Sequence, residues 1–249
     1  MRWLHDNIIT RAGTIISVSS ESIYQPLSNL QDQRLSRVFR TTAISNQWIK
    51  ISGGYFKASY VSILNHNITS SATIRIQGNN SDTWSSPAFS ADIPWDEYHL
   101  ILNFTEKSFA FWRIQISDPE NISDYIEIAN VYLGIYYQMP GMKPEQTIEN
   151  ETTSSVSFTL SGQCDGYDGY EFRNPSINHP RVTNAQRLDI IRIFQNIKNN
   201  HPIIFIIWAN QLDFERPIYG VIEGKLLSFK KSDNVNYPWS LTYKIREVY

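Results

Sequence analysis

The chain has 249 residues and a formal net charge of −2, so it can bury the core of one large β domain or of two ordinary domains. The near-neutral balance, with no basic stripe, argues against a nucleic-acid partner, because phosphate binding needs clustered lysine and arginine. Aromatic residues make up 13% of the chain, with seven Trp and fourteen Tyr, which is typical of β-sandwiches and recognition surfaces rather than of helical bundles.

Apolar residues at every second position dominate the first 135 residues. A half-buried strand requires this period, because successive side chains of a strand point to opposite faces. The segments with this pattern are 48–52, 60–65, 72–78, 99–104, 111–117 and 125–134. Turn-forming stretches rich in Gly, Asn, Ser and Pro separate them, and this organisation predicts a β-sandwich.

The alternation ends after Gly134, and the following stretch to residue 155 has two prolines and no apolar period, as at a domain boundary. Beyond it, a strand is predicted at 155–162, followed by one helix that Thr183 or Asn184 can cap and that ends at 199–202. The apolar side chains of this helix share one face, made of Leu188, Ile191, Phe194 and Ile197 and widened by Ile190 and Ile193.

Three strands are predicted after the helix. Residues 203–208 are apolar without alternation, as in a strand covered on both faces, with the helix on one of them. Segments 219–229 and 239–248 are predicted to form a hairpin with a long loop. The expected fold is therefore mainly β: an N-terminal β-sandwich plus a smaller α+β C-terminal domain with one main helix. The predicted parts are an N-terminal arm or strand (1–23), the sandwich (24–136), a linker (137–155) and the α+β assembly domain (156–249).

The sequence contains no recognisable catalytic constellation. Its five histidines are scattered, and none has the spacing of a known catalytic or metal-binding motif. Cys164 is the only cysteine, so an internal disulfide and a cysteine-based zinc site are impossible, and the residue is interpreted as structural. We therefore predict no catalytic residues, no cofactor and no metal.

Two acidic stretches offer alternatives to this prediction. Residues 165–171 place three acidic side chains among glycines, but calcium loops need more oxygen donors in a different frame, so a turn into the next strand is the preferred interpretation. Residues 92–97 also hold three acidic side chains, which could include a general acid and a base. Glycosidase carboxylates are identified by their separation in space, which a sequence does not show.

Aromatic rings in loops are the better functional candidates. Trp84, Trp95 and Tyr98 lie in predicted loops, and sugars stack their apolar C–H faces on such rings while their hydroxyls bond nearby polar groups. The same rings could instead close the end of a sandwich or form a contact between subunits. Together with His66, which follows the second predicted strand, they are the candidate glycan or subunit contacts.

Targeting signals are not recognisable. The N-terminal stretch lacks the continuous apolar run of a signal peptide, and no run approaches the roughly 18 apolar residues of a membrane span. We expect a protein that is made and folded in a cytoplasm and has no membrane partner.

The order of the strand segments resembles the galactose-binding-like jelly-roll of discoidin-type domains. The resemblance rests on NQWIKISGG (46–54), ASYVSILNHN (58–67), SATIRIQGNN (71–80) and FWRIQISDPENISDYIEIANVYLG (111–134). It covers roughly residues 24–136 and implies a sandwich scaffold of this type. The disulfide that often ties the termini of secreted members is impossible with one cysteine.

A second, narrower resemblance is to proteins encoded among the tail genes of tailed bacteriophages and prophages. It rests on YQPLSNLQDQRLSRVFRTT (24–42), on LNHN (64–67), on the closing strand, and on a capped helix followed by HPIIFIIW (201–208) and a hairpin. It implies a structural component of the tail tip or baseplate, of the distal-tail type, which self-associates into a ring and connects other tail proteins. It also implies assembly in the host bacterial cytoplasm and a final location in the virion tail. The alternative function is a carbohydrate-binding module for a host or polysaccharide glycan.

One ion pair is also suggested by the alternation. Arg113 and Glu127 occupy polar positions of consecutive predicted strands, where a pair across the strands would contribute about 0.2 to 1 kcal/mol.

Overall fold

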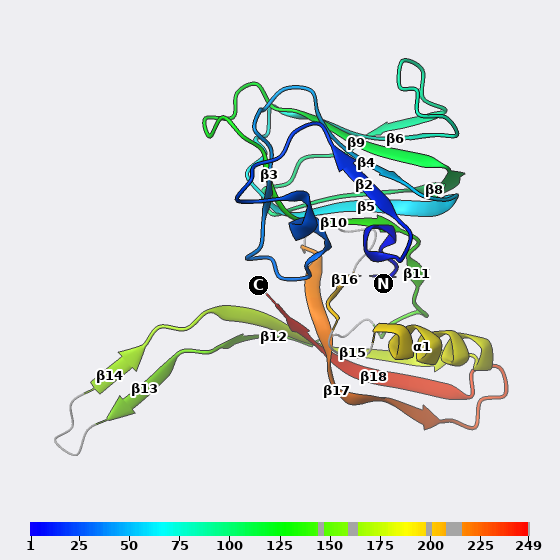
Figure 1. Cartoon of the computed structure of the whole chain (residues 1–249). Helices are drawn as coiled ribbons and strands as arrows, with labels where there is room; N and C mark the ends of the chain where they lie inside the picture. Colours follow the sequence, from blue (N-terminus) through cyan, green and yellow to red (C-terminus); the bar gives the residue numbers. More distant parts are fainter. Residues whose placement is uncertain (144–146, 159–163, 198–200, 208–215, 249) are drawn as a thin grey trace. The chain divides into compact units, whose positions relative to one another are not determined.

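The alternating segments of the first half of the chain form two sheets that share one core (Figure 1). The five-stranded sheet has the order β2 (Ile15–Val18), β4 (Gln47–Ser52), β9 (Phe111–Ser117), β6 (Thr73–Asn79) and β7 (Phe89–Asp92). The four-stranded sheet has the order β3 (Phe39–Arg40), β10 (Glu127–Gly134), β5 (Phe56–His66) and β8 (His99–Phe109). The six predicted segments coincide with β4, β5, β6, β8, β9 and β10, so the predicted β-sandwich is confirmed.

This computed structural model describes residues 1–143, 147–158, 164–197, 201–207 and 216–248, without the side chains of 156, 158, 164, 165 and 224–226. The chain divides into two units by its contacts. Leu4–Tyr137 form the first, here called the sandwich domain, while Met1–Trp3 and Gln138–Val248 together form the second, here called the sheet domain. Both are built mainly from strands, as predicted, and no helix of the described residues is long and apolar enough to cross a membrane.

The core of the sandwich follows from the alternation. Ile49 and Ile51 of β4 point inward and are buried, whereas Trp48 and Lys50, which alternate with them, point outward. Trp112 is fully buried, its Nε1 donates to the carbonyl oxygen of Phe56 at 3.1 Å, and three phenylalanine rings surround it. Two 3₁₀ helices, η1 (Ile8–Thr10) and η2 (Leu27–Gln31), add further apolar side chains to this core.

The suggested pair of Arg113 and Glu127 is wrong, because β9 and β10 lie in different sheets. Arg113 donates from Nε to Oε1 of Gln77 on the neighbouring strand β6 at 2.8 Å. Glu127 pairs with Arg40 of β3 instead, at 2.5 Å. Consecutive strands of a sandwich often belong to opposite sheets, and alternation within each strand does not show this.

The sheet domain is built on a seven-stranded sheet. Its order is β11 (Tyr137–Gln138), β1 (Arg2–Leu4), β16 (Ile203–Ile206), β17 (Ile218–Lys231), β18 (Trp239–Glu247), β15 (Glu171–Val182) and β12 (Thr147–Thr152). All four residues of β16 are buried, as its continuous apolar sequence predicts. β17 and β18 pair antiparallel, which confirms the predicted C-terminal hairpin.

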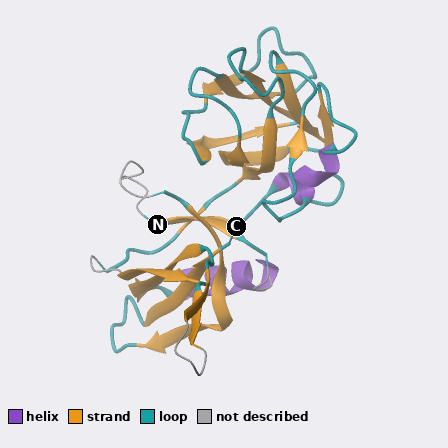
Figure 2. Ribbon diagram, turned by 90° about the vertical axis from the view of Figure 1, so that its left-hand side faces the viewer, coloured by secondary structure: helices purple, strands orange, loops and turns teal. Residues whose placement is uncertain are grey.

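Helix α1 (Asn184–Ile197) lies against the sheet (Figures 1 and 2). Thr183 caps it: Oγ1 accepts from the Gln186 amide at 3.2 Å while Gln186 Oε1 accepts from the Thr183 amide at 2.9 Å, a reciprocal capping box. The predicted apolar face is shifted, because the buried residues are Ile190, Ile193 and Ile197, whereas Leu188 is exposed. The two isoleucines that were expected only to widen the face are its centre.

The structure divides the chain differently from the predicted N-terminal segment (1–23) and linker (137–155). Within residues 1–23, β1 belongs to the seven-stranded sheet and β2 to the sandwich. Within 137–155, β11 and β12 are the two edge strands of the seven-stranded sheet. These strands are short or polar, and their partners are distant in sequence, so local periodicity does not reveal them.

A hairpin extends from the sheet domain. β12 pairs with β15, and beyond this pair β13 (Ser155–Phe158) and β14 (Cys164–Tyr167) form a separate two-stranded sheet. We call residues 147–176 the arm (Figure 1). The strand predicted at 155–162 corresponds to β13 in its first half, and its second half lies outside the described residues.

Candidate functional site

Five connecting segments meet at one end of the sandwich domain, here called the loop end. They are residues 19–25, 41–46, 67–72, 93–98 and 118–126. The strand register brings them together, since Thr73 pairs with Ser117 in one sheet and Leu64 pairs with His99 in the other. The loops at residues 53–55 and 80–88 follow the opposite strand ends and lie at the other end of the sandwich.

Hydrogen bonds link the loops of the loop end in series. Asp118, which is fully buried, accepts from the amide of Thr69 at 2.8 Å and from Nδ2 of Asn121 at 3.0 Å. The other links are Trp95 Nε1 to Ile68 O at 2.9 Å, Asp118 N to Ile44 O at 2.9 Å and Thr42 N to Ser20 Oγ at 3.1 Å. These bonds fix the loops relative to one another.

Large apolar side chains are concentrated at the loop end. In the described part of the sandwich domain, seven such side chains are exposed, and five of them belong to these loops. They are Ile23, Tyr24, Trp95, Tyr98 and Ile122. Because a soluble surface usually carries exposed apolar residues singly, this grouping marks an interaction surface.

Trp95 and Tyr98 are held in place by their own loop. The Trp95 ring is 41% exposed and is anchored through its Nε1, whereas Tyr98 is 44% exposed. Asp96 Oδ1 accepts from the amides of Tyr98 and His99 at 2.9 and 3.1 Å, which closes the turn between the two rings. The result is a pair of half-exposed aromatic rings on a short, internally bonded turn.

His66, at the end of β5, is partly buried next to this surface. Its Nδ1 accepts from the amide of Ile68 at 3.1 Å, so the proton of the neutral ring is on Nε2, which is buried. Burial is the main cause that lowers the pKa of His66 to about 4. The ring is therefore neutral at pH 7 and supports the 67–72 loop, whose Ile68 carbonyl accepts the hydrogen bond from Trp95.

Trp84 lies apart from the other three predicted residues. It belongs to the loop between β6 and β7, which follows the opposite end of those strands, and its ring stacks with Arg113 on the outer face of the five-stranded sheet. Of the four predicted contact residues, Trp95, Tyr98 and His66 lie at the loop end, and Trp84 belongs to another surface.

Two of the acidic residues considered from the sequence have structural partners. Asp92 pairs with Arg75 at 2.6 Å, and Asp96 closes the turn described above. The side chain of Asp165 lies outside the described residues, so that alternative stays open. Within the described residues, no group of three or more His, Cys, Asp or Glu side chains is placed to hold a metal ion.

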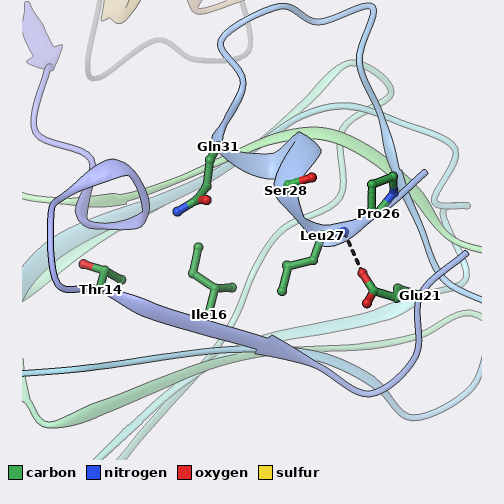
Figure 3. A pocket seen from close by; sticks show the side chains of 7 residues that line it. All are labelled: Thr14, Ile16, Glu21, Pro26, Leu27, Ser28 and Gln31. Carbon is green, nitrogen blue, oxygen red and sulfur yellow. Dashed lines mark hydrogen bonds between the residues drawn. The ribbon is translucent and has the colours of Figure 1, made fainter. Parts of the chain in front are cut away.

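A hollow of about 380 Å³ lies between β2 and η2 (Figure 3). Glu21, which lines it, accepts from the amide of Leu27 at 2.7 Å and so caps the first turn of η2. Gln31 donates to the carbonyl oxygen of Ile9 at 3.0 Å, and Thr14 donates to that of Ile8 at 2.8 Å. These polar side chains bond the backbone of η1 and η2 and hold both helices on the sandwich. The groups that line the hollow therefore have structural partners.

No protein-family model matches the sequence, and the search of curated proteins gives no match. Among solved structures, the chain is similar to galactose-binding-like carbohydrate-binding modules. They include the lectin domain of lectinolysin complexed with Lewis B antigen (15% identity, TM-score 0.42, 51% of this chain and 95% of that chain). A second is the family 32 carbohydrate-binding module of NanJ from C. perfringens in complex with galactose (14% identity, TM-score 0.41, 52% of this chain and 97% of that chain). A third is a fucose-binding module from Streptococcus pneumoniae (15% identity, TM-score 0.43, 53% of this chain and 99% of that chain).

Three residues of the loop end were missed in the sequence. Ile23, Tyr24 and Ile122 are isolated apolar residues in polar stretches, which is a visible signal, but only the folded loops show that they share one surface. The sequence predicts only an ion pair with Glu127 for Arg113. Its stacking on Trp84 is not predictable from the sequence, because the two residues are 29 positions apart.

Proposed function

We propose that the sandwich domain binds a glycan at the loop end, through the faces of Trp95 and Tyr98. The observation that supports this most directly is the pair of half-exposed rings on a turn fixed by hydrogen bonds. Pyranose rings stack on such faces, and a rigid platform loses little conformational entropy on binding. Polar groups of the same turn, such as the carboxylate of Glu97, are available to the sugar hydroxyls.

Replacing Trp95 with alanine is expected to weaken glycan binding at least about tenfold, because one stacking surface is lost. A glycan array identifies the ligand, and calorimetry then measures its affinity for the wild type and the variant. Tyr55→Ala is the matched control, since Tyr55 is 72% exposed on a loop at the other end of the sandwich and is expected to leave affinity unchanged. Thermal unfolding of each variant checks that the sandwich is intact.

Tyr98→Ala provides a second variant that does not remove the hydrogen bond from Trp95 to Ile68. Equal affinity of the wild type and both loop-end variants would contradict the proposal, as would the absence of binding to any glycan on the array.

A second candidate function is that of a structural subunit of a phage-tail particle, which the sequence resemblance implies. The arm supports it. Every residue from Thr147 to Tyr170 whose burial is described is exposed or half-buried, and β13 and β14 pair only with each other in the described part. A two-stranded hairpin without a core is marginally stable alone, so the arm gains stability from a neighbouring molecule. We propose a second copy of this chain as that neighbour, within a ring in the tail of a virion.

Replacing Tyr167 with serine is expected to shift the protein from an oligomer to a monomer, because its ring is 68% exposed on the arm and provides apolar area for the contact. Light scattering over a range of concentrations measures the mass. Tyr55→Ser, an equally exposed tyrosine outside the arm, should leave the mass unchanged. A wild-type protein that stays monomeric at all concentrations would contradict this second function.

A further inference from the structure

The outward face of the five-stranded sheet carries a cluster of hydrogen-bond donors. Ser17, Lys50, Arg113, Gln77 and Ser90 are consecutive partners across β2, β4, β9, β6 and β7, so they form one row across the sheet. Three of the five are Lys, Arg and Gln, which present N–H donors. This row lies on the side of the sheet opposite to the sandwich core.

Arg113 is held rigidly in the middle of this row. Its Nε donates to Gln77 Oε1 at 2.8 Å, and its guanidinium carbon lies 4.4 Å from the centroid of the Trp84 ring. The Trp84 ring is itself fixed, because Nε1 donates to Asp82 Oδ1 at 2.8 Å and Asp82 in turn pairs with Lys50 at 2.6 Å. Stacking and the Nε bond fix the plane of the guanidinium and leave its two terminal nitrogens for another acceptor.

Two donor groups of this cluster have no acceptor among the described residues. They are the terminal nitrogens of Arg113 and Nε2 of Gln77. Gln77 is 6% exposed as a residue, and its amide lies beside the guanidinium, to which Oε1 is hydrogen-bonded. Both groups are hydrogen-bond donors, so a ligand that pairs with them has to supply an acceptor.

The local charge selects an anion. Lys50 and Arg113 are positive and Asp82 is negative, so the cluster has a net charge of about +1. Hydrogen bonds from Lys50 and then from Trp84 lower the pKa of Asp82, which keeps it ionised and keeps Lys50 in place. A planar carboxylate matches the two parallel donors of a guanidinium, and the Gln77 amide adds a third donor.

We propose that the row formed by Lys50, Arg113 and Gln77 binds the carboxylate of an acidic saccharide, with the sugar ring lying against the indoles that flank the row. The Trp84 ring stacks on Arg113, and Lys50 Nζ lies 5.5 Å from the centroid of the Trp48 ring, so each cation of the row has an indole next to it. Half-buried indoles next to an anion site suit a pyranose better than an extended acidic peptide. This site is separate from the loop end, and it stands whether or not the loop end binds a glycan.

The test uses the full chain and three probes: an oligogalacturonate with free carboxylates, the same oligosaccharide after methyl esterification, and polyglutamate. We expect binding of the free acid, at least tenfold weaker binding of the ester, and at least tenfold weaker binding of polyglutamate. Equal binding of the ester would overturn the role of the carboxylate. Polyglutamate bound as well as the free acid would overturn the assignment to a saccharide.

Arg113→Gln is expected to weaken binding of the free acid at least tenfold. Arg75→Gln is the matched control, because Arg75 lies on the same face with the same charge but is already paired with Asp92. An equal loss in both variants would mean general charge attraction and would overturn the site. Trp84→Ala separates stacking from charge, and Tyr55→Ala, which removes an exposed aromatic ring outside the row, should leave oligogalacturonate binding unchanged.

Discussion

Replacing Trp3 with alanine is expected to lower the free energy of unfolding of the sheet domain by about 3 to 5 kcal/mol, the usual cost of removing a buried tryptophan. Trp3 is fully buried, and its ring makes edge contacts with Phe205 and Tyr243 at centroid distances of 5.9 and 5.4 Å. Its Nε1 also donates to the Tyr243 hydroxyl at 3.2 Å. β1 lies between β11 and β16, so the loss falls on an interior strand.

Urea unfolding followed by circular dichroism measures this loss, and hydrogen exchange locates it. The amides of β16 and β17 should lose protection, whereas those of the sandwich core around Trp112 should keep theirs. Tyr55→Ala, an exposed aromatic of the other domain, should change stability by no more than about 0.5 kcal/mol. If the two variants cost the same, Trp3 does not hold the sheet domain together.

Lowering the pH from 6.5 to 4 is expected to destabilise the sheet domain through His179. This ring is fully buried, with Nδ1 at 2.9 Å from the carbonyl oxygen of Pro140 and Nε2 at 3.1 Å from the Tyr243 hydroxyl. The carbonyl only accepts, so Nδ1 carries the proton and Nε2 accepts from the hydroxyl. Burial is the main cause that lowers the pKa of His179 to about 4.

The direction of this effect follows from where each state takes up the proton. Above pH 6.5 the ring is neutral in both states, and the pH has no effect through it. Below 6.5 the unfolded chain binds a proton that the folded chain takes up only near pH 4, so the free energy of unfolding falls by about 3 kcal/mol across this interval and then levels off.

Unfolding measured between pH 7.5 and 5, above most carboxylate pKa values, checks this prediction. His179→Gln should be less stable than the wild type at pH 7.5, because two buried hydrogen bonds change, but its stability should depend less on pH. A difference between the two proteins that stays constant over this range would show that the pKa of His179 is not lowered in the folded state. His66 gives the same dependence in the sandwich domain, since its pKa is also lowered to about 4.

Most strands of the sandwich could be predicted because their alternation is a local property. Ile49 and Ile51 face the core, and the residues between them do not, and no partner needs to be known to see this. The strands β1, β3 and β11 have two or three residues each, too few for a period, and they exist because distant segments supply their hydrogen bonds. The Trp3 ring packs in an interior strand against residues more than 200 positions away, Phe205 and Tyr243, so its burial is not visible in the local sequence.

The candidate site was predictable in part for the same reason. Trp95 and Tyr98 share one turn, so their proximity is local, and the sequence is sufficient to pair them. Trp84 and Arg113 meet only because β6 and β9 are neighbours in the sheet, and the loop after β6 turns back over its outer face. Arg113 was matched with Glu127 because both are charged and near in sequence, but sheet membership decides such pairs.

The two strands that join the domains have a consequence for how this protein can vary. β1 leads out of the seven-stranded sheet at Leu4, the chain returns at Tyr137 into β11, and β1 and β11 are neighbours in that sheet. In topological terms, the whole sandwich domain is an elaborated connection between two adjacent strands, equivalent to a short turn. It is an inserted domain, and a different domain could replace it while the strand order of the seven-stranded sheet stays the same.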